Sequence, residues 1–161
     1  MKMNGRTETG VQIRDFLIEV EGLLEESMTG LLTTVDGEGK PHIRWMTPTL
    51  LKDRPGALYA VTAKDFAKSE QLAENPFVEW MIQGRDLMRI AHISGRVNLI
   101  ENPSLRREVL EIIGPRLRVF WNVNHDTANL IVLETVMERG KFFIPMKGQT
   151  YDVKFGEPKE A

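Results

Sequence analysis

The chain has 161 residues, no cysteine and a formal net charge of −2. The lack of cysteine excludes disulfides, thiolate metal sites and cysteine nucleophiles, and the balanced charge disfavours a general nucleic-acid binder, which carries a clear basic excess. A hydrophobic content of 42% is ordinary for a globular protein, so we predict one domain over residues 1–161 with its core at about 11–144.

Nothing in the sequence predicts a membrane segment or a leader. The first ten residues are polar and lack the apolar stretch of a signal peptide. No apolar run approaches the ~20 residues of a membrane-spanning helix. We therefore expect a cytoplasmic protein with no membrane partner, and a polar, loosely held tail over residues 145–161.

The first part of the chain predicts one helix followed by three strands. Apolar residues recur at helical spacing over 11–28. Strands are expected at 31–35, 41–51 and 57–62, because two clusters of turn residues separate these apolar segments. Turns this short favour an antiparallel meander of the three strands.

The rest of the chain predicts two helices and three longer strands. Each helix is bounded by residues that cap or end helices, such as Asp65 and Pro103 at their starts. The expected helices are 65–74 and 103–113, and the expected strands are 77–83, 87–100 with a bend near Gly95, and 130–137 continuing through 141–143 after a turn at Gly140. We predict a mainly β fold, an antiparallel six- or seven-stranded barrel with peripheral helices.

The best candidate for a binding site is a group of cationic and hydroxyl side chains near residue 65. An apolar strand ends at Thr62, Lys64 and Lys68 follow around a helix start, and Arg44 lies on a neighbouring strand. Free N–H groups at a helix start, with arginine, lysine and hydroxyl donors, suit a bound phosphate. The alternative is that Arg44 pairs with an acidic neighbour and the lysines are only solvated.

The other sequence patterns give weaker evidence for a metal site, a catalytic nucleophile or a nucleotide-binding motif. The histidines at 42, 92 and 125 lack metal-ligand spacing, no serine has a nucleophile-elbow context, and no dinucleotide or triphosphate motif occurs. We therefore expect no metal and name no catalytic residue. Residues 116–121 mix arginines with Phe120 and Trp121, as single-stranded nucleic-acid sites do. We interpret this segment as a connection that packs its aromatic side chains inward and contacts a second protomer, rather than as a nucleic-acid site.

The order of these segments resembles the pyridoxamine 5′-phosphate oxidase-like FMN-binding split-barrel family, in its general-stress-protein branch. The similarity covers about residues 11–113 and rests on three segments, TGLLTTVDGEGKPHIRWM, LYAVTAKDFAKSEQLAENPFVEWMI and RIAHISGRVNLIENP. The resemblance implies a split β-barrel, FMN as the cofactor, and a homodimer with two FMN sites at its interface. It also implies a small-molecule electron donor or acceptor.

The resemblance further implies which residues bind FMN. The family's phosphate-binding arginine, threonine and lysine match Arg44, Thr62 and Lys68. The residues after the arginine line the ribityl chain and flavin ring in the family, which implies this role for Trp45, Met46 and Thr47. Ala63 and Lys64 fall in the loop beside the phosphate. Trp121 of the second protomer is expected to cover the flavin ring.

The chain departs from the family's vitamin-synthesis enzyme. Phe66-Ala67 replaces a Ser-Arg pair, Thr49 replaces a lysine, Ile90 replaces a glutamine, and the C-terminal substrate-phosphate motif is absent from 114–161. We therefore predict an FMN-dependent oxidoreductase of unidentified substrate rather than a true pyridoxamine phosphate oxidase. The alternatives are a non-catalytic flavin- or haem-binding sensor or storage protein, and a dimeric interaction module with an empty site.

Overall fold

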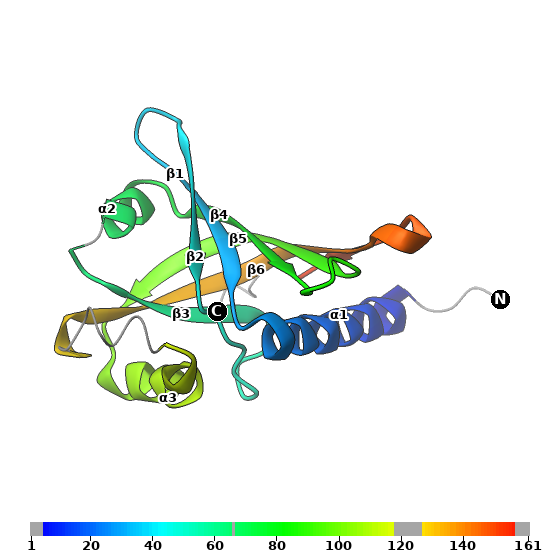
Figure 1. Ribbon diagram of the computed structural model, residues 1–161, viewed down its shortest axis with the longest axis horizontal. Coiled ribbons are helices and arrows are strands. Elements are labelled where there is room, and N and C mark those ends of the chain that lie inside the picture. The colour runs from blue at the N-terminus through cyan, green and yellow to red at the C-terminus, as the bar shows by residue number, and fades with distance from the viewer. Residues whose placement is uncertain (1–4, 66, 118–126, 157–161) are drawn as a thin grey trace.

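The computed structural model describes residues 5–65, 67–117 and 127–156, without the side chains of residues 5–11 and 67–69. This part of the chain forms a curled antiparallel sheet with three helices around it (Figure 1). The helices are α1 (Gly5–Ser27), α2 (Ala67–Glu74) and α3 (Pro103–Ile113). The strands are β1 (Gly30–Val35), β2 (Pro41–Met46), β3 (Ala57–Ala63), β4 (Phe77–Gln83), β5 (Ile90–Ile100), β6 (Leu130–Ile144) and β7 (Gln149–Lys154).

The strands that the structure describes follow the order β2-β1-β4-β5-β6-β3, and β7 pairs with β6 beside this path. β6 connects the two ends of the molecule, because its first half pairs with β3, its second half pairs with β7, and β5 runs along its other edge. The register between β5 and β6 shifts at Gly95, where a Cβ atom would overlap the carbonyl oxygen of Val136. The predicted antiparallel β fold and the bend at Gly95 are confirmed.

The predicted three-strand meander is wrong at its third strand. β2 ends at Met46 and pairs with β1, whereas β3 pairs with β6 at the other end of the sheet. The connection between β2 and β3 meets β3 at Thr49, whose backbone N and O atoms bond Tyr59 at 2.8 and 2.9 Å. The described residues show no other pairing between this connection and β3, so the sheet closes at one bridge and stays split elsewhere.

Two other expectations near the C-terminus are also wrong. β6 continues through Gly140 without a turn, and the missing side chain at this glycine leaves room for the ring of Phe16 from α1. Residues 149–154, expected in a loosely held tail, form β7 and bury Val153. Phe155 then packs against Phe16 with ring centroids 6.0 Å apart.

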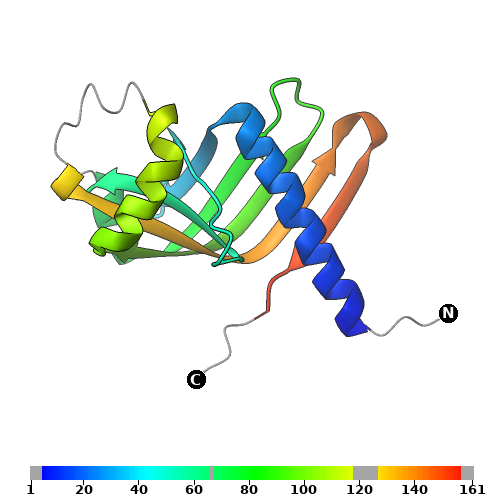
Figure 2. The ribbon, with the colours of Figure 1, turned by 90° about the horizontal axis from the view of Figure 1, so that it is seen from below.

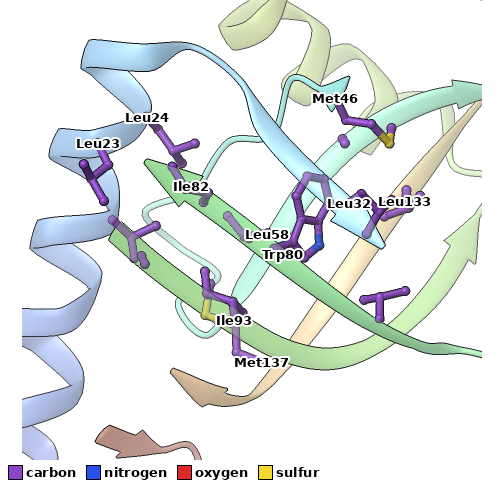
Figure 3. Packing of buried hydrophobic residues seen from close by; sticks show 14 of the residues in the cluster. Leu23, Leu24, Leu32, Met46, Leu58, Trp80, Ile82, Ile93, Leu133 and Met137 are labelled. Carbon is purple, nitrogen blue, oxygen red and sulfur yellow. The ribbon is translucent and has the colours of Figure 1, made fainter. Parts of the chain in front are cut away.

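The main core lies on the concave side of the sheet. Trp80 is 0% exposed and lies among leucines of the strands, while Leu23 and Leu24 enter from α1 (Figure 3). A second cluster fills the space between α3 and the other side of β3 and β6. Figure 2 shows α1 and α3 over different parts of the sheet. No helix in the described ranges combines the length and apolar character that spanning a membrane requires.

Candidate functional site

The short helix α2 covers the end of the curled sheet at which β3 finishes. Its sequence, AKSEQLAE, contains good helix formers, and Asn75-Pro76 follows its last turn. Leu72 packs into the main core. α2 contacts β1 and β5, and Figure 1 shows it near β1. The sequence predicts a phosphate at the start of this helix.

Arg44 of β2 reaches α2 and is held there by two neutral oxygen atoms. Its Nη2 donates to Thr34 Oγ1 at 2.6 Å and to Gln71 Oε1 at 3.2 Å. Thr34 in turn donates its hydroxyl proton to Gln71 Oε1 at 2.8 Å. Burial lowers the pKa of Arg44 below its ordinary value, and no carboxylate in the described part of the chain pairs with it. A partly desolvated cation without a counter-ion favours a bound anion.

Thr62 lies on the same side of β3 as Leu58 and Ala60, which belong to the main core. The side chain is 1% exposed, and its hydroxyl has no hydrogen-bond partner within the described structure. An unsatisfied buried hydroxyl costs about 1–3 kcal/mol. Such a group in a native fold calls for an explanation, and a ligand oxygen or a water molecule supplies one.

The loop between β3 and α2 is tied to two neighbouring connections. The backbone N of Lys64 donates to Asn129 O at 3.1 Å, and Asn129 Nδ2 donates to Asp65 Oδ2 at 3.1 Å. Lys64 Nζ lies 2.9 Å from Glu101 Oε1, so this lysine has an acidic partner. Ala63 is buried in the cluster beneath α3. The alternative was that Arg44 pairs with an acidic neighbour and the lysines are only solvated. In the described structure Arg44 bonds neutral oxygens instead, and Lys64 is the residue with an acidic partner.

The residues after Arg44 lie on different sides of β2. Met46 is buried in the main core, Trp45 is 81% exposed on the outer face, and Thr47 is half-buried beyond the strand end. Among the described strands, β2 has β1 as its partner on one edge only. Its other edge therefore presents backbone donors and acceptors. Such groups suit the polar rim of a flat ring.

The side chains of two predicted site residues lie outside the described part of the structure. Lys68 belongs to the first turn of α2, and its side chain is outside the described part of the structure. Trp121 lies wholly outside the described residues. The roles expected for both residues therefore stay predictions.

Sequence reasoning missed Thr34 and Gln71, which hold Arg44. Strand alternation puts Thr34 on the same side of β1 as the core residue Leu32, and a buried polar residue there was the available signal. Gln71 follows Lys68 by three residues on α2, a spacing that places both on one helix face. The predicted pairing of strands 31–35 and 41–51 brings Thr34 near the strand of Arg44, but only the folded chain brings Gln71 of α2 to both of them.

The histidines with described side chains lie apart and serve other contacts. His42 Nε2 lies 2.8 Å from Asp36 Oδ2, and this hydrogen bond lowers the pKa of Asp36 below its ordinary value. His92 lines a hollow of about 350 Å³ with Glu79 and Ser94, and Ser94 donates to Glu79 at 2.6 Å. The residues that the structure describes contain no cluster of three or more metal-binding side chains.

Other surface hollows lie away from Arg44, Thr62 and Lys64. A hollow of about 640 Å³ separates α1 from β6 and β7, and one of about 350 Å³ lies between α1 and residues 50–55. A smaller hollow of about 240 Å³ lies beside Trp45. The candidate phosphate site is therefore defined by its unpaired polar groups rather than by one of these hollows.

Comparison with known proteins identifies the family. The model of the pyridoxamine 5′-phosphate oxidase family matches residues 16–142. A candidate pyridoxamine 5′-phosphate oxidase from Listeria innocua is 28% identical, with a TM-score of 0.60, over 79% of this chain and 95% of its own. General stress protein 26 from Bacillus anthracis is 18% identical, with a TM-score of 0.66, over 84% of this chain and 97% of its own.

A haem-binding protein from Mycobacterium smegmatis is also similar in fold, at 18% identity and a TM-score of 0.65, over 84% of this chain and 56% of its own. No curated protein matches the chain. At these low identities the last two structures support the fold alone. The family match, which covers most of the barrel, shows that the chain belongs to the pyridoxamine 5′-phosphate oxidase family.

Proposed function

We propose that this protein binds FMN in the split between β2 and β3 and acts as an FMN-dependent oxidoreductase on a small molecule. The observation that carries this proposal is Arg44, a half-buried guanidinium bonded to the neutral oxygens of Thr34 and Gln71. Family membership makes a flavin phosphate the natural anion for that charge.

The residues near α2 fit a phosphate monoester, which carries roughly −1.5 to −2 charge at neutral pH. Arg44 uses Nη2 for Thr34 and Gln71, and its Nε and Nη1 groups have no partner among the described residues. Two parallel N–H groups of arginine match two phosphate oxygens. The orphan hydroxyl of Thr62 supplies a further donor, and Lys68 is expected to add charge from the start of α2.

The chain's part in the chemistry is to bind, orient and shield the cofactor, and bound FMN would supply the hydride and electron transfer. We propose that the open edge of β2 at Trp45, Met46 and Thr47 meets the flavin through backbone groups, since the side chains of Trp45 and Met46 point elsewhere. We assign no catalytic acid or base. Pyridoxamine phosphate is not proposed as substrate, because the family's C-terminal substrate-phosphate motif is missing.

We also propose that the protein is a homodimer whose partner covers the outer face of β2. Ile43 is 68% exposed there beside Trp45, and strand pairing continues this apolar surface through Leu31 to Met81. A contiguous exposed apolar surface of this kind marks an interaction site. A second copy of the chain is the proposed occupant, and it would place both FMN sites at the shared interface.

An absorbance spectrum of the purified protein, before and after FMN addition and desalting, tests the cofactor. Flavin bands that survive desalting support the proposal and justify assays with NADH, NADPH and small oxidised substrates. A protein that stays colourless, or one that instead gives a Soret band after haem addition, contradicts FMN as the ligand. His42 already bonds Asp36, so an axial haem contact at this histidine would have to displace that carboxylate.

Arg44→Ala tests the phosphate contact by itself. We expect FMN affinity to fall about tenfold or more, because a charge-assisted bidentate contact is lost, while riboflavin affinity changes little. Arg14→Ala is the matched control, since Arg14 is exposed on α1. Equal FMN affinity in wild type and Arg44→Ala would remove this arginine from the site.

Light scattering at low micromolar concentration tests the dimer. A stable interface buries about 1,200 Å² or more, and Trp45→Asp would place a charge within it. We expect a dimer mass for the wild type and a monomer mass for Trp45→Asp. A wild-type monomer would overturn the proposed dimer.

A further inference from the structure

We infer that Gln71 is a positioning residue that aims Arg44 at a phosphate-bearing ligand while leaving its charge uncompensated, an inference that rests on the proposed function. Gln71 Oε1 accepts hydrogen bonds from Arg44 at 3.2 Å and from Thr34 at 2.8 Å. Gln71 lies on α2 and its two partners lie on β2 and β1. Three separate elements are therefore joined at one amide oxygen.

The chemistry of the partners fixes the orientation of this amide. A guanidinium only donates hydrogen bonds, so the Gln71 atom facing Arg44 must be the oxygen. Thr34 Oγ1 accepts from Arg44 at 2.6 Å, and its own proton is therefore directed to Gln71. The Gln71 Nε2 group points the other way and has no partner among the described residues.

An amide at this position leaves the charge of Arg44 free for the ligand, whereas a carboxylate would pair with it. Glutamate would accept the same two hydrogen bonds, but its negative charge would pair with Arg44 and compete with a phosphate. Glutamine orients the guanidinium and leaves the full positive charge for the ligand. Gln71 thereby determines selectivity for a flavin that carries a phosphate over one that does not.

The test substitutes Gln71→Glu and compares FMN, riboflavin and inorganic phosphate as probes. We expect FMN affinity to fall about tenfold or more, because the new carboxylate pairs with Arg44, while riboflavin affinity stays within about twofold. The melting temperature without ligand should stay equal or rise, since Arg44 gains a counter-ion. A merely structural role for Gln71 would instead change both flavin affinities together and lower the melting temperature.

Gln149→Glu is the matched control. It makes the same chemical change on exposed β7, where Gln149 Oε1 accepts a bond from Tyr151 that a carboxylate also accepts. We expect both flavin affinities to remain at their wild-type values. Gln71→Met is a second variant of similar shape without a charge, and we expect it to weaken FMN binding less than Gln71→Glu does.

The outcomes separate this inference from the proposed function. If the wild type retains FMN and Gln71→Glu keeps the wild-type ratio of FMN to riboflavin affinity, the role of Gln71 is overturned and FMN binding stands. If the wild type binds no FMN but inorganic phosphate raises its melting temperature, and Gln71→Glu abolishes that rise, FMN is excluded and the role of Gln71 is supported. If neither FMN nor phosphate affects the wild type, both proposals are overturned.

Discussion

The ammonium group of Lys64 lies 2.9 Å from a carboxylate oxygen of Glu101. The pair connects the loop before α2 to the residues between β5 and α3, and both side chains are partly exposed. A surface ion pair of this kind contributes about 0–1 kcal/mol to stability. Its greater consequence concerns the proposed FMN site, because Glu101 pairs with a lysine that we expect beside the phosphate.

Glu101→Gln should therefore strengthen FMN binding. Releasing Lys64 returns one positive charge to the proposed phosphate site, and we expect the affinity to rise by about two- to tenfold at low salt and less at high salt. Titrations of FMN at two salt concentrations measure this change. Glu138→Gln is the control, because Glu138 lies 2.8 Å from Arg96 in another exposed pair. Equal gains in both variants would indicate a general effect of net charge.

Thr135→Val should destabilise the protein, although the two side chains have nearly the same shape. Trp80 Nε1 donates to Thr135 Oγ1 at 2.9 Å, and both residues are fully buried. The substitution leaves the indole N–H without an acceptor, which costs about 1–3 kcal/mol of unfolding free energy. Denaturant unfolding measures the loss, with Thr33→Val on the more exposed side of β1 as the control. An unchanged unfolding free energy would show that the hydrogen bond is dispensable.

Gly140→Ala should disturb the contact between α1 and β6. A Cβ atom at this position would overlap the ring of Phe16, which also packs against Phe155. Overpacking of this kind costs about 1–3 kcal/mol. Thermal unfolding should show a clear loss for Gly140→Ala and little change for Gly156→Ala, where a Cβ meets open space.

A double variant checks that the cost of Gly140→Ala arises at Phe16. Adding Phe16→Leu should make the effect of Gly140→Ala smaller, because the shorter side chain can yield to the new methyl group. Strictly additive losses would locate the strain elsewhere along β6.

Stability at alkaline pH should depend on Tyr59. Burial, followed by its 3.0 Å hydrogen bond to Glu134, raises the pKa of Tyr59 from 10.0 to about 12. Because the folded-state pKa exceeds the unfolded value, the stabilisation is complete below pH 10 and is lost as the pH rises towards 12. Urea unfolding between these limits should show a steeper loss for the wild type than for Tyr59→Phe.

The control for Tyr59 is Tyr151→Phe. Tyr151 is exposed on β7 and bonds Gln149, so its removal should leave the alkaline loss of stability as steep as in the wild type. A wild-type slope that persists in Tyr59→Phe would assign the effect to other groups.

Much of the fold could be predicted because its signals are local. The strand at Phe77–Gln83 and the helix that begins at Pro103 appear where alternation, caps and proline place them. Asn102 accepts the backbone N–H groups of Ser104 and Leu105 as a helix cap should. Errors arose at long-range contacts, such as the continuous strand through Gly140, which depends on Phe16 from the far end of the chain.

For the candidate site, the sequence by itself determined the residue types, an arginine on one strand and a hydroxyl and lysines around the next helix, and through their order it indicated the family. The tertiary structure decided which of these charges are free. It gave Lys64 an acidic partner in Glu101 and gave Arg44 the neutral oxygens of Thr34 and Gln71. Charge pairing depends on distances between elements far apart in the chain, and local sequence patterns do not encode those distances.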